Sequence, residues 1–147
     1  MLPRVMSINY HDSPLPAYAG VHSTSWAIMN SELKHGISWH VIEIGIDTGD
    51  ILQFKEVTVA DNDSALTLNL KCQEAAKQAF SNLLSDIRND TVERQIQPQE
   101  GRSYFGLYAI PPNAGVLSFD SKSQEIYNIA RSLNLETITT RLLVQKL

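Results

Sequence analysis

The sequence predicts an α/β fold, in which strands and helices alternate along a chain of 147 residues. Short runs rich in alternating or β-branched apolar residues predict strands at 5–11, 37–44 and 51–59. Apolar residues at helical spacing predict helices at 23–31 and 64–89. Because the two kinds of pattern alternate, a layered α/β domain is the expected architecture.

Composition sets the general class of protein. The hydrophobic content of 43% and the charged content of 19% are ordinary for a globular chain, and the net charge of −4 gives no general attraction to nucleic acid or anionic membrane. A lone cysteine, Cys72, excludes an internal disulfide and fits a reducing compartment. The first residues are too short and mixed for a signal peptide, and no apolar run reaches membrane-spanning length. We therefore expect a cytoplasmic domain.

The first elements present polar groups at a strand end. In the strand at 5–11, Ile8 and Tyr10 share one face, whereas Asn9 and His11 point to the other. Two prolines make residues 12–18 a loop, and Gly20 then allows a tight turn. A helix is expected at 23–31.

The later elements are a strand pair and a long helix. The strands at 37–44 and 51–59 are joined by a turn containing Asp47 and Gly49. Either Asp63 or Ser64 is expected to cap the long helix, and Asn89 to end it. Its expected core stripe comprises Leu66, Leu70, Ala76, Phe80, Leu83, Leu84 and Ile87. An extended linker at 90–113, a short strand at 116–119 and a helix at 123–133 complete the predicted elements.

The polar residues suggest acyl-transfer chemistry. Asn9 and His11 present an amide and an imidazole side by side, both donors suited to an oxyanion. A carboxylate such as Asp47, delivered by a neighbouring turn, would keep the imidazole protonated and could accept a proton from an attacking amine. These three residues supply every role needed to move a one-carbon acyl group.

At this point a family resemblance can be stated. Residues 8–52 resemble the catalytic half of the folate-dependent formyltransferases, which include methionyl-tRNA, glycinamide ribonucleotide and nucleotide-sugar formyltransferases. The similar motifs are Asn9-Tyr10-His11, Ser13-Pro14-Leu15-Pro16, Tyr18-Ala19-Gly20 and Asp47-Thr48-Gly49. His40 also matches a histidine of some members, while Pro14 replaces a more usual leucine.

The resemblance implies a partial Rossmann-like domain with 10-formyltetrahydrofolate as formyl donor and an amine as acceptor, either a small molecule or carrier-bound. It implies Asn9, His11 and Asp47 as catalytic residues. The residues that it implies for substrate or cofactor binding are Ser13, Leu15, Gly20, His40 and Gly49. We expect no metal, and methionyl-tRNA is disfavoured by the net charge.

The resemblance also predicts a division of the chain. Residues 1–100 would form the C-terminal half of the catalytic domain, and residues 101–147 a linker with the start of a C-terminal region. The N-terminal half of the family's domain would precede Met1, so a separate N-terminal half or an adenylation module is an expected partner.

Alternatives remain open at this stage. The chain could be an inactive or split fragment that needs a partner for activity. A metal-dependent hydrolase could use His11, His22, His40 and Asp47. His40 could instead be a packing residue, and His22 and His35 loop or helix-end residues. Trp26 and Trp39 are expected to pack in the core rather than stack on a base.

Overall fold

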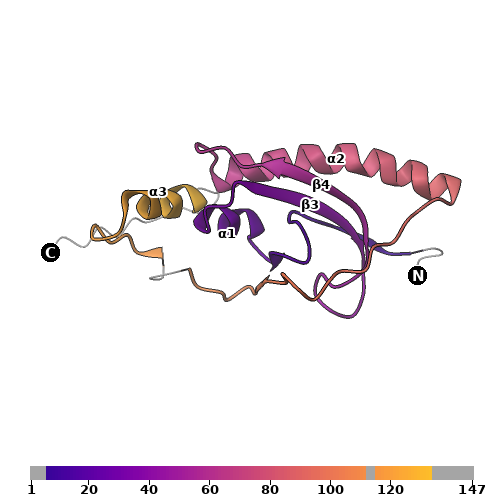
Figure 1. The fold of residues 1–147 in the computed structure, drawn as a ribbon, viewed down its shortest axis with the longest axis horizontal. Coiled ribbons are helices and arrows are strands. Elements are labelled where there is room, and N and C mark those ends of the chain that lie inside the picture. The colour runs from indigo at the N-terminus through magenta and orange to yellow at the C-terminus, as the bar shows by residue number, and fades with distance from the viewer. Residues whose placement is uncertain (1–5, 112–114, 134–147) are drawn as a thin grey trace.

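The computed structural model describes residues 6–111 and 115–133 of the chain. It confirms the α/β class, with two small sheets and three helices (Figure 1). The elements, in chain order, are β1 (Ile8–His11), β2 (Ala19–Gly20), α1 (Ser23–Met29), β3 (Lys34–Val41), β4 (Ile51–Thr58), α2 (Ala65–Asn89), β5 (Tyr104–Phe105) and α3 (Ser123–Ser132).

The main sheet has the strand order β1-β3-β4, and both pairings are antiparallel. In β1 and β3, Asn9 lies opposite His40 and His11 lies opposite Ser38. Directly opposed residues point to the same face, and successive residues alternate between faces. One face of the β1–β3 pair is therefore polar, and the other carries Tyr10 and the partly buried Trp39.

Helix α2 covers the apolar face and runs along β3 and β4 (Figure 1). It begins with a capping box, in which Ser64 accepts from the backbone of Thr67 while the Thr67 hydroxyl accepts from the backbone of Ser64. The helix ends at Asn89, and Asp90 takes the left-handed conformation that follows many helices. Both predicted ends of this helix are thus confirmed.

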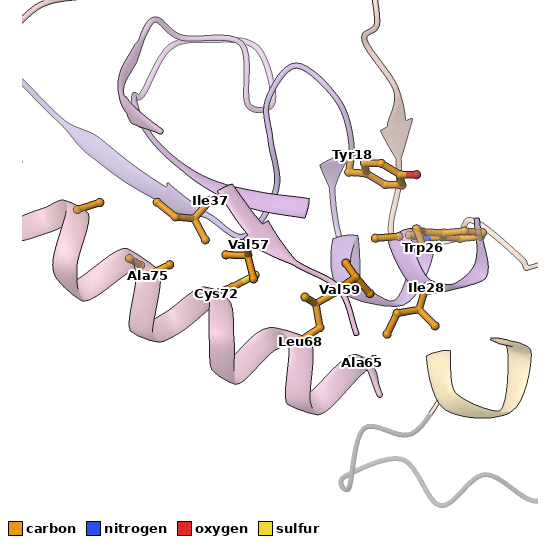
Figure 2. Close-up of a cluster of buried hydrophobic side chains, with 13 residues drawn as sticks. Tyr18, Trp26, Ile28, Ile37, Val57, Val59, Ala65, Leu68, Cys72 and Ala75 are labelled. Carbon is orange, nitrogen blue, oxygen red and sulfur yellow. The ribbon is translucent and has the colours of Figure 1, made fainter. Parts of the chain in front are cut away.

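The main core lies between α2, the sheet and α1. Figure 2 shows Leu68, Cys72 and Ala75 of α2 beside Ile37 and Val57 of the sheet, with Tyr18 and Trp26 further along the same cluster. The packing role expected of Trp26 is confirmed, and Trp39 packs against the ring of Phe80 with its centroid 4.7 Å away. Cys72 is part of this core.

Four expectations about local structure are wrong. His35 is a buried residue of β3, not a loop or helix-end residue, because β3 begins earlier than expected. Leu70 and Leu84 are about half exposed, since the face of α2 that meets the sheet runs instead through Leu68, Cys72, Ala75, Ala79 and Leu83. Residues 116–119, which the structure describes, form no strand.

The fourth wrong expectation is that 90–113 is only an extended linker. Within it, β5 pairs in parallel with β2, and Gln95 forms a β-bridge with Ile51. Backbone pairing therefore holds this segment against the domain. In the described ranges 6–111 and 115–133, no helix is both long and apolar enough to cross a membrane.

Candidate functional site

Asn9 and His40 form a cross-strand pair on the polar face of the main sheet. Asn9 Nδ2 lies 3.3 Å from His40 Nε2, and His40 Nδ1 lies 2.9 Å from the Val41 carbonyl oxygen. A carbonyl can only accept, so Nδ1 of His40 carries a proton and Nε2 faces the site. When His40 is neutral, its Nε2 accepts from the Asn9 amide, which fixes the orientation of that amide.

His11 closes β1 and is buried beneath the loop that follows. Its Nε2 donates to the Tyr18 carbonyl oxygen at 2.9 Å, so Nδ1 is the ring nitrogen left for the site. That nitrogen lies 3.8 Å from Oδ2 of Asp47. The loop after β1 thus selects which side of the imidazole faces the carboxylate.

Asp47 brings a carboxylate from the loop between β3 and β4 to both imidazoles. Its Oδ2 accepts the backbone N–H of Gly20 at 2.8 Å, and its Oδ1 lies 3.5 Å from His40 Nε2. Burial by itself raises the pKa of the Asp47 carboxyl, but hydrogen bonds from His40 and Gly20 and the charge of His11 together lower it below its ordinary value. The site therefore holds an ionised carboxylate.

His40 Nε2 faces two partners that demand different protonation states. It accepts from Asn9 only when it is unprotonated, and it donates to Asp47 only when it carries a proton. A proton that moves between Asp47 and His40 would also release or engage the Asn9 amide. The geometry thus links a carboxylate, an imidazole and an amide into one proton-sensitive group.

Two glycines allow this close arrangement of loops. A Cβ on Gly20, whose φ is +100°, would lie 2.1 Å from the Phe105 carbonyl oxygen. A Cβ on Gly49 would lie 1.9 Å from the Val41 carbonyl oxygen. A side chain at Gly20 would push β5 away, and a side chain at Gly49 would displace the loop that carries Asp47. Both predicted glycines therefore permit the close packing around Asp47.

Ser13 and Leu15 lie in the loop after β1 and are buried. The Ser13 hydroxyl donates to the Ala17 carbonyl oxygen at 2.8 Å. Ser38 of β3 donates its hydroxyl to the Ser13 carbonyl oxygen and accepts the Leu15 backbone N–H. Ser13 and Leu15 therefore help to shape the loop that leads to Tyr18, the residue whose carbonyl binds His11. Their roles in binding a substrate or cofactor stay predictions.

Sequence reasoning missed several residues of the site. Ser38 is two residues before His40 on the same strand, so the period of two could have placed it on the polar face. Gln97 donates to the backbone carbonyl of Asp47 and Arg102 to that of Ile46, and the Ser103 hydroxyl accepts the Tyr18 N–H. No local pattern announces these three, since their partners are about fifty residues or more away along the chain.

The structure does not gather every candidate ligand of the alternative metal site. His11, His40 and Asp47 come together, whereas His22 is an exposed residue that precedes α1. Within the part of the chain that the structure describes, no group of three or more His, Cys, Asp or Glu side chains is placed to hold a metal ion.

An amide and two imidazoles on one face of the sheet, with a carboxylate from the neighbouring loop, are groups that can stabilise an oxyanion and accept a proton. Comparison with known proteins gives the family: the model of the formyl transferase family matches residues 1–84, so the chain belongs to that family. The recognition made from the sequence motifs is confirmed.

Individual relatives support the same family assignment. The chain is 30% identical over 133 residues to the methionyl-tRNA formyltransferase of Clostridioides difficile and 33% identical to that of Halothermothrix orenii, with 90% of this chain covered in each case. A crystal structure of an N-formyltransferase from Helicobacter canadensis, in complex with folinic acid and dTDP-3-aminofucose, matches with a TM-score of 0.78 and 33% identity over 85% of this chain and 46% of that chain. The chain spans 42% of the length of the two methionyl-tRNA formyltransferases.

Proposed function

We propose that this chain takes part in transfer of a formyl group from 10-formyltetrahydrofolate to an amine. The observation that carries the proposal is the contact of one carboxylate, Asp47, with two imidazoles and a backbone N–H beside the Asn9 amide. A folate-type donor is supported by the folinic acid in the Helicobacter canadensis relative. We further propose a cytoplasmic location, since that compartment suits a lone, buried Cys72.

Each residue has a role in the proposed reaction. The amine nitrogen attacks the formyl carbon, a new C–N bond forms, and the carbonyl electron pair moves to oxygen. The Asn9 amide and the protonated His11 Nδ1 stabilise this oxyanion as hydrogen-bond donors. Asp47 accepts the proton lost by the amine. The oxyanion then reforms the carbonyl while the bond to N10 breaks. N10 takes the proton that Asp47 received from the amine, so tetrahydrofolate leaves neutral at that nitrogen and Asp47 is again a carboxylate.

His40 and the neighbouring residues support these roles. When His40 is neutral, its Nε2 accepts a hydrogen bond from the Asn9 amide and orients that amide. When His40 is protonated, the same nitrogen donates to the Asp47 carboxylate. We propose that Ser13, Leu15, Gly20 and Gly49 form the walls around the reacting groups, because their loops carry the partners of His11 and Asp47. No metal is needed for any of these steps.

The acceptor that we favour is an amino sugar nucleotide or an aminoacyl group on a carrier. The Helicobacter canadensis relative binds dTDP-3-aminofucose, which supports an amino sugar. The relatives named for methionyl-tRNA share similar identity, but a net charge of −4 gives little attraction to the phosphates of tRNA. Methionyl-tRNA therefore ranks second among acceptors.

A second candidate function is that of a split formyltransferase, active only with a partner half or an attached adenylation module. One observation favours it: β1, which carries Asn9 and His11, is an edge strand of the described sheet. An edge strand can pair with a strand of another chain. As part of this proposal, residues 1–100 form the catalytic part and residues 101–147 the region that follows it.

Formyl transfer itself provides the test. Tetrahydrofolate release would be measured with 10-formyltetrahydrofolate and, in turn, dTDP-3-aminofucose and methionyl-tRNA as acceptors. We expect Asp47→Asn to lower kcat by about 10²- to 10⁴-fold, because the variant keeps the shape of the side chain but cannot accept a proton. Asp50→Asn, at another carboxylate of the same loop, is the matched control and should retain activity within about twofold.

The outcomes separate the candidates. Turnover by the chain alone that is lost in Asp47→Asn supports the first function and excludes an inactive fragment. Turnover that needs an added N-terminal half from a related formyltransferase supports the split enzyme. Equal turnover by Asp47→Asn and Asp50→Asn would contradict the assigned role of Asp47.

A further inference from the structure

We propose that Gln97 and Arg102 are positioning residues, which hold the Asp47 carboxylate against His11 and His40 by binding the backbone of its loop. They belong to a segment of residues 95–105, termed here the strap. The proposal rests on the proposed function, because it concerns the same site. The strap was expected from sequence to be linker, and the predicted division at residue 100 passes through it.

Gln97 binds two backbone carbonyls of the loop that carries Asp47. Its side-chain Nε2 donates to the carbonyl oxygens of Asp47, at 3.0 Å, and of Gly49, at 2.6 Å. The residue is only 8% exposed, so these bonds are shielded from water that could replace them. A buried carbonyl without a donor is costly, and one amide here satisfies two carbonyls.

Arg102 binds the same loop at the adjacent peptide. Its Nη2 donates to the Ile46 carbonyl oxygen at 2.9 Å, and its Nη1 lies 3.5 Å from the Asp47 carbonyl oxygen. Asp47 has φ +51°, a left-handed conformation that is unfavourable for a residue other than glycine. Such a conformation persists only where surrounding contacts impose it. Gln97 and Arg102 are contacts of this kind.

The strap also fixes the loop on the other side of the site. Ser103 accepts the Tyr18 N–H on its hydroxyl and the Ala19 N–H on its carbonyl oxygen, at 2.8 and 2.9 Å. Phe105 stacks between the rings of Tyr18 and Trp26, with centroid distances of 5.6 and 4.4 Å. Tyr18 supplies the carbonyl that His11 binds. One segment thus sets the spacing between the loop that orients His11 and the loop that carries Asp47.

Loss of Gln97 should therefore move Asp47 without removing any reacting group. Asp47 would separate from the Gly20 N–H and from the two imidazoles, which are the groups that stabilise its charged form. Those contacts, not contacts with Gln97 itself, lower the pKa of Asp47. A rise of that pKa in a Gln97 variant is a signature that a merely stabilising residue would not produce.

The primary experiment is a pH titration of the Asp47 carboxyl by ¹³C NMR in the full chain. The variants are Gln97→Ala and Gln97→Glu, the latter replacing the donor with an acceptor of nearly the same shape. The matched control is Gln95→Ala on the same strap, because Gln95 contacts Ile51 through its backbone. We expect the pKa of Asp47 to rise in both Gln97 variants and to stay at the wild-type value in the control.

Kinetics supply the second readout. Gln97→Ala should lower kcat by about 10- to 100-fold, through misplacement of the proton acceptor, with KM for the formyl donor changed less than about threefold. Arg102→Lys retains a positive charge but cannot span two carbonyls, and we expect a smaller change in the same direction. It also serves as the test variant if Gln97→Ala does not fold.

The two proposals can fail separately. If the wild type transfers no formyl group, either alone or with an added N-terminal half, but Gln97→Ala still raises the pKa of Asp47, the proposed function is wrong and the positioning holds. If the Asp47 titration and kcat are unchanged in folded Gln97→Ala and Arg102→Lys, the positioning proposal is overturned. Equal effects of Gln95→Ala and Gln97→Ala would also overturn it.

Discussion

The two faces of the β1–β3 strand pair differ in character: one is apolar and packs in the core, and the other is polar and forms the candidate site. On one face, the rings of Tyr10 and Trp39 lie 5.5 Å apart, and Trp39 packs against Phe80 of α2. On the other face, Asn9 and His40 meet beside a carboxylate. Adjacent residues of the same strand therefore serve either the core or the site.

The difference lies in where each face finds its partners. Helix α2 runs along the apolar face, and its own pattern of small and apolar residues supplies most of the contacts. The polar face is completed by separate loops after β1 and β3 and by the strap at 95–105. Stability should thus depend mainly on the first face, and the geometry of the site on the second. Variants can test this division.

The largest expected effect on stability is on the apolar face. Leu68→Ala removes a fully buried side chain of the main core, and we expect the free energy of unfolding in urea to fall by about 3 kcal/mol. Leu70→Ala, on the same helix but 53% exposed, is the matched control and should change it by less than about 0.5 kcal/mol. Similar losses for both variants would mean that α2 meets the sheet through a different face.

Gly49→Ala should disrupt the arrangement of residues on the polar face, with a smaller loss of stability than Leu68→Ala. The new Cβ would lie 1.9 Å from the Val41 carbonyl oxygen, so the loop must shift, at a cost of about 2 kcal/mol. Since Asp47 is in that loop, its contact with Gly20 should be lost, which the Gly20 amide chemical shift would report. Gly106→Ala, whose Cβ would meet nothing nearer than 3.4 Å, is the control. An unchanged Gly20 signal in Gly49→Ala would show that the loop adapts without moving Asp47.

The smallest effect concerns His35, an ionisable residue buried with the apolar face. Burial lowers the pKa of His35 below its ordinary 6.5, and the hydrogen bond to the Asp12 carbonyl offsets this only in part. The unfolded chain therefore binds a proton that the folded chain resists, so stability should fall as the pH drops below about 6.5.

We expect His35 to account for part of the loss of stability between pH 7 and pH 5. This would be measured as the difference between the wild type and His35→Gln, which keeps an N–H donor for Asp12. His22→Gln, at an exposed histidine, should keep the wild-type dependence on pH. A wild-type slope in His35→Gln would show that His35 is not the group responsible.

Much of this could be predicted from sequence because it is local. The capped helix from Ser64 to Asn89 and the alternation that sets Asn9 apart from Tyr10 follow from periodicity and end signals. Motif spacing brought Asn9, His11 and Asp47 forward as one group, and the structure places them together. Local patterns failed where burial depends on distant partners, as for His35 in β3 and for Leu70 on α2.

The sequence by itself determined the α/β class, the ends of the long helix, the family and the candidate site residues Asn9, His11 and Asp47, because each depends on spacing within a short stretch of chain. Only the tertiary structure decided which nitrogen of His11 and His40 faces the carboxylate, and that Gln97 and Arg102 hold Asp47 in place. The choice of ring nitrogen depends on bonds to the nearby Tyr18 and Val41 carbonyls, whereas the bonds of Gln97 and Arg102 join segments about fifty residues apart. Such bonds have no period and leave no pattern in the sequence.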